Sequence, residues 1–424
     1  MTAHYYCLLA GKLFDSDARV LLTNKAITIE RHRGIILDIR SINDPPFSPN
    51  SNETEMIDLR HLVVIPGFVD VHVHMFLHPY SEVSWNDQLT KESLAERTLR
   101  ASVHARRTLL AGFTTVRDLG TEGAFDADIA LRKCLAGRDP IVVGPRYYCA
   151  NRAIVTTGSY GPKSGIHFST EGVEGITGAE AADGKDECVK AVRRQIGAGA
   201  DWVKIYADYR VRSRVVDVSP NVSAQSIKMF SDDELKAMID TAHGLGVKVA
   251  AHANTPQAIR SLLRLGIDTV EHGAEMVKEG DDTLVREFAA KESVTWVPTL
   301  GAYYTSGGES SKGWRQCVKT FTRAVVEQNG AKMDNIACGG DTGVFAHGQN
   351  ALELVLMRQI GAGWEKVLSW ATLGGWRCWA ADIIALEGSI DGDFGEFKKA
   401  VESVSFVMKG GRVYKRDGQA ILPL

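Results

Sequence analysis

The feature that most constrains this chain is a set of metal-binding residue types at the ends of short apolar segments. Six such residues stand at or near the C-terminal ends of five strand-like segments: His72, His74, Lys204, His252, His272 and Asp341. The strands of a β/α barrel all end at one face, so side chains from several strand ends converge there. The pattern therefore predicts a barrel with a metal site at the C-terminal ends of its strands.

The middle of the chain repeats a strand-then-helix pattern. Strand-like segments are expected at 68–74, 113–118, 141–148, 201–206, 247–252, 267–272, 294–299 and 336–341. Helix-like stretches are expected at 91–111, 185–198, 232–245, 255–265 and 281–291. This succession predicts a (β/α)8 TIM barrel. A doubly wound open sheet is the alternative, but no GxGxxG follows the first strand and the metal-binding types are spread over many strands.

Both ends of the chain have the pattern of antiparallel β-structure. Short apolar runs separated by turn residues fill 5–42, and similar runs return from 383 onward with a hairpin turn at 409–411. Neither end alone has enough strands to bury a face. We therefore predict a small β-sandwich domain built from both chain ends, with the barrel between them: residues 1–65 with 380–424, and residues 66–379.

Composition and charge exclude several classes of protein. The chain is 44% hydrophobic and 24% charged, as in ordinary globular proteins. A net charge of −3 gives no electrostatic case for binding nucleic acid or a membrane. There is no apolar run long enough for a transmembrane helix, no signal-peptide pattern, and no CxxC pair among the seven cysteines. We expect a cytoplasmic protein.

The first strand-like segment carries two of the candidate ligands. Period-two alternation places Asp70, His72 and His74 on one face and the valines on the other. Two imidazoles two residues apart on a strand can bind one metal ion. An isolated His-Val-His is explained equally well by two buried histidines with hydrogen-bond partners, so the other four residues are what favour a metal site.

Lys204 and Asp341 have distinct roles in this hypothesis. A lysine inside a barrel strand is costly unless its charge is paired or its pKa falls, and pairing with a carboxylate is the alternative interpretation. A neutral lysine amine can react with CO2 to form a carbamate, which can bridge two cations. His252 and His272 would each supply an imidazole to a second ion. Asp341 can ligate an ion and accept a proton from water.

The ligand set also restricts the metal, and the loops suggest substrate contacts. Histidines and carboxylates without cysteine suit zinc and tolerate manganese, cobalt or iron. Tyr160 follows the third strand, and Tyr206 and Arg210 follow Lys204, so all three are candidates for substrate binding. Arg210 can pair with a substrate carboxylate. A structural loop and a solvated charge explain these positions equally well.

The motifs resemble those of the amidohydrolase superfamily, in the same order and over most of the chain. They are Pro66–His74 (PGFVDVHVH), Gly112–Asp118 (GFTTVRD), Ala251–Ala253 (AHA), Val270–Gly273 (VEHG) and Gly340–Thr342 (GDT). The chain looks most similar to the imidazolonepropionase-like branch, which includes metal-dependent Xaa-Pro dipeptidases and ochratoxinase. The resemblance implies the barrel, the two-ended β-sandwich and two divalent metal ions.

The resemblance also implies a role for each ligand. The His-Val-His pair and Asp341 would hold the first ion, His252 and His272 the second, and an N6-carboxylated Lys204 would bridge the two. A hydroxide between the ions would attack the scissile carbonyl, with Asp341 as the proton shuttle. The chain departs from its relatives in two places. Tyr160 stands where they often carry the histidine of Gly-Gly-His-Gly, and the connection over 371–382 looks shortened.

We therefore predict a metal-dependent hydrolase of C–N amide bonds that acts on a dipeptide or an N-acyl amino acid. The alternatives are a cyclic amide hydrolase of the imidazolonepropionase kind and a deaminase with one metal ion. A non-catalytic barrel would be expected to lose ligand residues. A metal-free glycoside hydrolase built on Asp118 and Asp341 would leave the histidines unexplained. The relatives are often oligomeric, but no sequence feature tests whether this chain forms a homo-oligomer.

Overall fold

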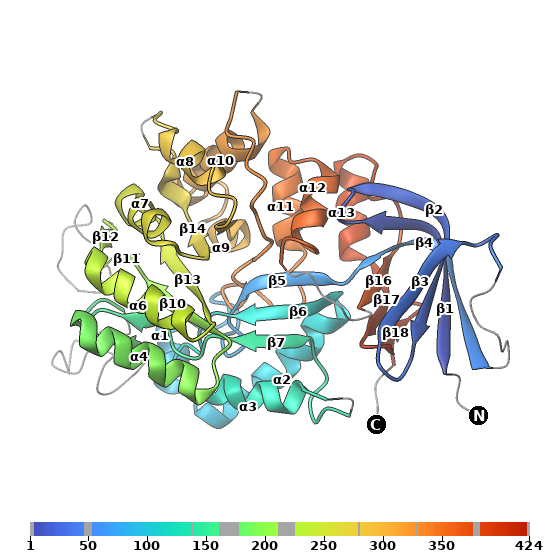
Figure 1. Ribbon diagram of the computed structural model, residues 1–424, viewed down its shortest axis with the longest axis horizontal. Helices are drawn as coiled ribbons and strands as arrows, with labels where there is room; N and C mark the ends of the chain where they lie inside the picture. Colours follow the sequence, from blue (N-terminus) through green and yellow to red (C-terminus); the bar gives the residue numbers. More distant parts are fainter. Residues whose placement is uncertain are drawn as a thin grey trace.

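The computed structural model describes residues 4–45, 53–137, 139–160, 178–210, 225–278, 280–327, 329–375 and 382–421. Within these residues a barrel of strands and helices lies beside a β-domain formed by strands from both ends of the chain (Figure 1). Half of the connection expected to be short, 371–382, falls outside the described residues, namely 376–381.

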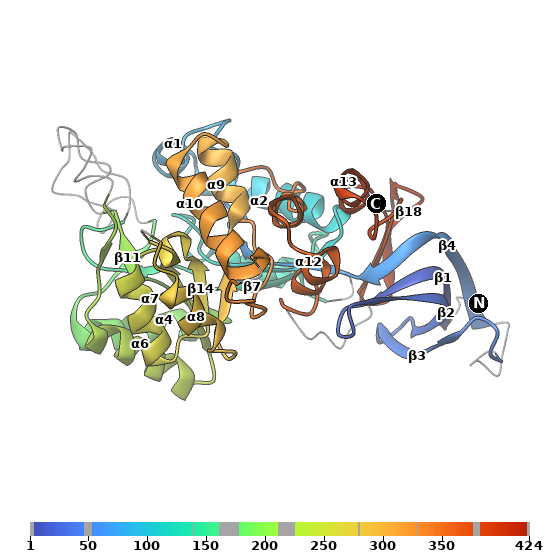
Figure 2. The ribbon, with the colours of Figure 1, turned by 90° about the horizontal axis from the view of Figure 1, so that it is seen from above.

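The β-domain lies at one end of the molecule (Figure 2). It is a single hydrogen-bonded sheet with the strand order β19-β18-β17-β16-β4-β1-β2-β3. Its strands are β1 (Tyr5–Asp15), β2 (Val20–Glu30), β3 (Ile35–Ser41), β4 (Thr54–Pro66), β16 (Ile383–Leu386), β17 (Val404–Lys409), β18 (Arg412–Arg416) and β19 (Gln419–Ala420). The two chain ends meet where β4 pairs antiparallel with β16. Leu8, Ile27, Ala385 and Phe406 share one buried cluster, so both halves of the sheet enclose a common core. The prediction that the chain ends form one β-domain is confirmed.

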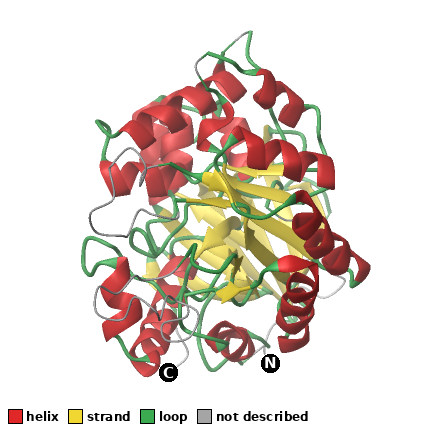
Figure 3. Cartoon of the chain, turned by 90° about the vertical axis from the view of Figure 1, so that its left-hand side faces the viewer, coloured by secondary structure: helices red, strands yellow, loops and turns green. Residues whose placement is uncertain are grey.

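The barrel strands run parallel and alternate with helices. They are β5 (Phe68–Val73), β6 (Phe113–Asp118), β7 (Arg146–Cys149), β10 (Trp202–Tyr206), β13 (Lys248–Ala253), β14 (Thr269–His272) and β15 (Thr295–Val297). Four shorter strands form two pairs. β8 (Ile154–Val155) lies between β10 and β9 (Glu180–Ala181), and β11 (Asp208–Tyr209) pairs with β12 (Ile227–Lys228). Figure 3 shows the strands enclosed by helices.

Backbone hydrogen bonds continue around the ring where regular pairing stops. The amide of Asp201 donates to the carbonyl of Cys149 at 2.8 Å and joins β10 to β7. The segment 336–342 fills the space between β15 and β5, because Ala337 donates to Trp296 and Asp341 donates to His72. This segment forms only isolated bridges instead of the expected strand.

Close packing explains why this last segment is irregular. A Cβ on Gly339 would lie 2.5 Å from Cγ1 of Val297 and 2.9 Å from Cβ of His72. Only glycine permits that approach, and the backbone then turns at Asp341 with a positive φ of 62°. The expected strand at 141–148 is also shorter, since only Arg146–Cys149 pair.

Twelve α-helices lie in the described residues, and several of them begin at a side-chain cap. They are α1 (Trp85–Lys91), α2 (Leu94–Leu110), α3 (Ala127–Leu135), α4 (Gly184–Ala198), α6 (Asp232–Gly244), α7 (Pro256–Leu265), α8 (Thr283–Ala289), α9 (Leu300–Gly307), α10 (Lys312–Phe321), α11 (Leu352–Ile360), α12 (Trp364–Trp370) and α13 (Phe394–Glu402). The helix expected over 91–111 starts later, because Ser93 caps α2 by accepting the amide of Glu96. A capping box between Ser231 and Glu234 begins α6. No helix in the described ranges is long and apolar enough to cross a membrane.

Candidate metal centre

The fold brings all six candidate ligands to the C-terminal ends of the barrel strands. His72 lies within β5 and His74 directly follows it; Lys204 lies in β10, and His252 in β13. In the β13–β14 register, Ala253, which directly follows His252, pairs with His272. His272 ends β14, and Asp341 lies in the irregular last segment. Every one of these side chains is buried or nearly so.

The side chains converge at one point. One ligand atom each from His72, His272 and Asp341 lies within 4.8 Å of the others. Oδ1 of Asp341 is 3.3 Å from Nε2 of His74 and 3.6 Å from Nε2 of His72. The ring centroids of His252 and His272 are 4.4 Å apart. Four imidazoles and a carboxylate therefore face one small volume, which is the donor chemistry of a divalent metal site.

Lys204 provides the test of whether a metal fits this site. Its side chain is fully buried, and its Nζ has no hydrogen-bond partner among the described residues. Burial lowers the pKa of Lys204 to about 8, although Glu271 and Asp341 act in the opposite direction. Among the described residues, Lys204 therefore forms no hydrogen bond with a carboxylate, although two carboxylates lie near enough to favour its charge. A buried amine without a partner is costly, so the residues present fit a missing ligand group at Nζ.

Hydrogen bonds on the outer nitrogens orient the histidines. Nδ1 of His72 lies 2.8 Å from Oε2 of Glu271, and Nδ1 of His74 lies 2.8 Å from the carbonyl oxygen of Gly120. Both acceptors require the proton on Nδ1, which leaves Nε2 with a free lone pair toward the centre. Nδ1 of His272 lies 2.8 Å from the hydroxyl of Thr299. Three of the four imidazoles are thus held in orientations suited to metal binding.

Glu271 is a functional residue that the sequence reasoning did not single out. Its other oxygen accepts a hydrogen bond of 2.9 Å from Arg117, whose guanidinium also donates to the carbonyl of Val71. Burial alone would raise the pKa of Glu271, but Arg117 and His72 outweigh it and lower the pKa to about 2. The carboxylate is therefore ionised and holds His72 in place. An acidic residue directly before a candidate ligand, within the short buried strand Thr269–His272, was the signal for it.

A second buried carboxylate, that of Asp70, shapes the turn that carries Asp341. Asp70 accepts the amides of His72 and Gly340 and the side chain of Asn350 at 2.7 Å. Burial raises the pKa of Asp70 to about 7. Asp70 therefore connects β5 to the last segment instead of serving as a ligand, although it shares the inward face with His72.

The loops above the centre meet at another carboxylate that the sequence reasoning missed, that of Glu122. It accepts hydrogen bonds from Nε1 of Trp85 at 2.9 Å, from the hydroxyl of Tyr160, and from the hydroxyl of Tyr206 at 3.4 Å. The backbone at Glu122 has a φ of 50°, and Arg97 donates to its carbonyl oxygen. Two of the three candidate substrate-binding residues therefore lie together at the centre.

The remaining candidates separate into exposed and packed residues. Arg210 is exposed at the end of β11. The pKa of His252 lies well below its ordinary value, first because of burial and then because of Lys204 and His72, and the charge of Arg210 adds to this effect. Asp118 is fully engaged by the hydroxyl of Tyr147 and by two backbone amides, so it is not available as a glycosidase carboxylate.

A parallel-stranded barrel with imidazoles, a lysine and an aspartate at its strand ends defines a metal-dependent hydrolase. The family model of the amidohydrolase family matches residues 63–383, and the chain belongs to this family. It is a hydrolase that acts on carbon–nitrogen bonds.

Relatives and solved structures agree with this assignment. Ochratoxinase from Aspergillus niger is 26% identical over 451 residues, which cover 97% of this chain and 87% of that protein. An uncharacterised protein of Mycobacterium tuberculosis is 26% identical over 333 residues, 75% of this chain and 73% of its own length. A crystal structure of a Xaa-Pro dipeptidase with methionine in the active site superposes with a TM-score of 0.77 at 25% identity and covers 97% of this chain and 100% of its own.

Proposed function

We propose that the chain is a binuclear metal-dependent amidohydrolase that cleaves the amide bond of a dipeptide or an N-acyl amino acid. The observation that carries this proposal is the unpartnered amine of Lys204 beside four imidazoles and a carboxylate. A carbamate on Nζ would supply the two oxygens needed to join one ion held by the His-Val-His pair and Asp341 to a second held by His252 and His272. Zinc is the ion we expect.

The ions and the chain divide the chemistry between them. When bound, two divalent cations acidify water and polarise the scissile carbonyl. Asp341 takes the proton of the attacking water on its carboxylate and delivers it to the leaving nitrogen. His72 and His74 fix the position of this carboxylate, at 3.6 and 3.3 Å from its Oδ1. Burial would raise the pKa of Asp341, but the histidines outweigh burial and hold it well below its ordinary value.

The substrate carboxylate has a candidate partner at the edge of the centre. Arg210 is exposed, and its charge contributes to the lowered pKa of buried His252 after burial, Lys204 and His72. A guanidinium in this position can bind a carboxylate through two hydrogen bonds. Tyr206 and Tyr160 would line the space between Arg210 and the ions. The ring of Tyr206 packs against that of His252, and the hydroxyl of Tyr160 donates to Glu122.

Glu122 bears on the choice between the two substrate classes. Its carboxylate forms no ion pair with any described residue and receives hydrogen bonds from neutral donors. A dipeptide carries an ammonium group that a buried carboxylate attracts, whereas an N-acyl amino acid carries none. On this basis the dipeptide, of the Xaa-Pro kind, is the substrate class that we favour.

The test combines metal analysis with a substrate panel. We expect close to two zinc ions per chain by mass spectrometry of the purified protein. Dipeptides, their N-acetylated forms, other N-acyl amino acids and cyclic amides would be compared by kcat/KM. One ion per chain together with release of ammonia would favour the mononuclear deaminase, and turnover of cyclic amides alone would favour the imidazolonepropionase-like alternative.

Two further properties remain predictions. The described cysteines are all free thiols, which is compatible with the reducing cytoplasm that we expect. Light scattering of the purified protein would test for the homo-oligomer that is common among the relatives.

A further inference from the structure

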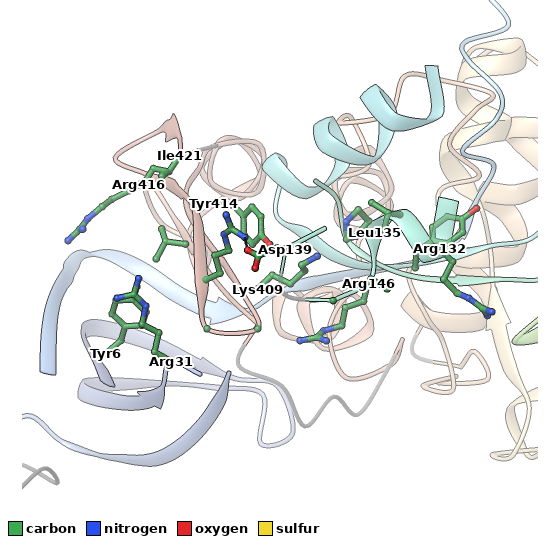
Figure 4. A pocket seen from close by; sticks show the side chains of 18 of the residues that line it. Tyr6, Arg31, Arg132, Leu135, Asp139, Arg146, Lys409, Tyr414, Arg416 and Ile421 are labelled. Atoms are coloured by element: carbon green, nitrogen blue, oxygen red, sulfur yellow. Dashed lines mark hydrogen bonds and ion pairs between the residues drawn. The ribbon is translucent and has the colours of Figure 1, made fainter. Parts of the chain in front are cut away.

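A cavity of about 730 Å³ lies between the β-domain and the barrel, and none of the candidate ligands lines it (Figure 4). Figure 4 shows that side chains from both parts line it: Tyr6 and Arg31 from the β-domain, Arg146 from the start of β7, and Lys409 and Tyr414 from the hairpin of β17 and β18. Because β7 enters the barrel at Arg146, the cavity belongs to the N-terminal side of the strands. The metal centre lies at their C-terminal side.

The lining of this cavity is strongly positive in a chain whose net charge is −3. The described lining contains six cationic side chains: Arg31, Arg132, Arg146, Lys409, Arg412 and Arg416. Its carboxylates are Glu55 and Asp139, and Asp201 and Asp382 pair with lining arginines from behind. Six cations against four carboxylates leave two positive charges. A cavity of this size and charge suits a small dianion.

Two of these cations have no carboxylate partner in the described part of the chain. The ammonium of Lys409 donates to the carbonyl of Gly144 at 2.5 Å and forms no ion pair there. The pKa of Lys409 falls to about 8, first because of burial and then because Arg146 and Arg412 add to burial against the opposing effect of Asp382. The guanidinium of Arg31 lies 5.2 Å from the ring centre of Tyr6 and likewise forms no ion pair with a described residue.

The other arginine contacts are loose where they face the cavity. Arg412 lies 3.4 Å from Asp139, whose side chain is 93% exposed. Arg416 lies 3.4 Å from Glu55. Exposed pairs of this kind contribute little to stability, so an incoming anion can compete for these guanidinium groups at small cost.

Two turns hold the unpaired cations at fixed positions. A Cβ on Gly34 would lie 2.3 Å from the carbonyl carbon of Gly410, so the turn after β2 and the turn after β17 touch at their backbones. The amide of Gly410 also donates to Asp382, which forms a two-point ion pair with Arg146. The cationic lining is therefore built on rigid contacts between the β-domain and the barrel.

We propose that this cavity, which we call the junction cavity, binds a small molecule that carries a phosphate group. A phosphate monoester brings two negative charges, which match the two uncompensated cations. Arginine is suited to phosphate oxygens because its planar guanidinium donates two parallel hydrogen bonds. The hydroxyls and rings of Tyr6 and Tyr414 lie in the same lining and offer contacts to the rest of the molecule. This site is independent of the proposed hydrolytic function.

The test is calorimetric titration of the whole protein at pH 7 in 0.15 M NaCl. The probes are inorganic phosphate and adenosine 5′-monophosphate, with adenosine as the uncharged control. Arg31→Gln removes an unpaired cation of the junction cavity. Arg33→Gln is its matched control, because Arg33 is two residues away, exposed, paired with Glu30 and absent from the lining. We expect the Kd of the preferred probe to rise at least fivefold in Arg31→Gln and less than twofold in Arg33→Gln.

The outcomes distinguish the source and the place of binding. Tighter binding of the nucleotide than of phosphate would support a site for a phosphate monoester, and equal binding would support a site for free phosphate. Binding that both Arg31→Gln and Lys409→Met leave unchanged would place the anion elsewhere, including at the metal centre, and would overturn the proposal. The absence of saturable binding of either probe up to about 5 mM would overturn it as well. Lys409→Met provides a second variant, for which the same loss of affinity is expected.

Discussion

Replacing Lys204 with methionine separates the cost of this lysine to the stability of the metal-free protein from its proposed role in metal binding. The side chain is fully buried and its Nζ has no hydrogen-bond partner among the described residues. Its pKa falls from 10.5 to about 8. At 1.36 kcal/mol for each pH unit, this fall corresponds to a penalty of about 3 kcal/mol on the metal-free folded state at pH 7. Methionine has a similar length and no charge, so the metal-free variant should be more stable than the wild type by about that amount.

The sign of the pH dependence follows from the same values. The folded-state pKa of Lys204 is below its unfolded value, so between about pH 8 and 10.5 the unfolded chain binds more protons than the folded chain. The stability of the wild type should therefore rise relative to the variant as the pH increases through this window, and the full penalty applies below pH 8. Urea unfolding of both metal-free proteins at pH 7 and pH 9.5 measures the difference, while other titrating groups cancel.

Loading with metal should reverse this order. With a pKa of about 8, about one amine in ten is neutral at pH 7, compared with about one in three thousand at the ordinary value, and only the neutral amine reacts with CO2. We expect the wild type to take up two zinc ions and a ¹³C-bicarbonate label, and the variant to take up fewer than one ion and to lose activity. A variant that is less stable than the wild type at pH 7 would refute the desolvation argument. A variant that retains two ions would refute the bridging role.

Three other variants test individual contacts of the centre. Glu271→Gln should weaken zinc binding about 10- to 100-fold in competition with a chelating dye, because His72 loses its charged partner; unchanged affinity would show that the contact at 2.8 Å does not orient the imidazole. Asp341→Asn should lower kcat at least about 100-fold in samples verified to contain metal, and near-normal turnover would exclude the proton shuttle. Glu122→Gln should reduce the preference for a dipeptide over its N-acetylated form by about tenfold, whereas Glu82→Gln, an exposed control, should not. If the wild type, Glu122→Gln and Glu82→Gln all showed the same preference, Glu122 would have no role in substrate selection.

Sequence patterns were most informative where hydrophobic alternation and ligand chemistry coincide. The apolar segment before His72 defines both the strand and its inward face, and the segment before His252 is similarly regular. The β14 strand is shorter than expected, and its end turns at His272 with a φ of 72°, which no periodicity indicates. The sequence pattern also could not predict the irregular segment between β15 and β5, because its geometry depends on Gly339 packing against residues far away in sequence.

The parts of the centre that escaped prediction are those that depend on tertiary contacts. Glu122 lies in a loop and has no motif around it; its role appears only when Trp85, Tyr160 and Tyr206 converge on its carboxylate. Arg117 belongs to a recognised motif, yet only the fold places it against Glu271. The junction cavity depends on contacts between the two ends of the chain and the barrel, which no local pattern encodes.

The metal-free centre combines several unfavourable features that a bound ion would offset together. The backbone takes a positive φ at His272, Thr299 and Asp341, and such residues cost about 1–3 kcal/mol each. Lys204 adds a buried amine without a partner. Close packing of Gly339 accounts for the irregular path before Asp341, but it leaves the buried amine of Lys204 without a partner among the described residues. The common location of these features at the strand ends argues that the centre is preorganised for cations, and that metal binding contributes directly to the stability of the folded chain.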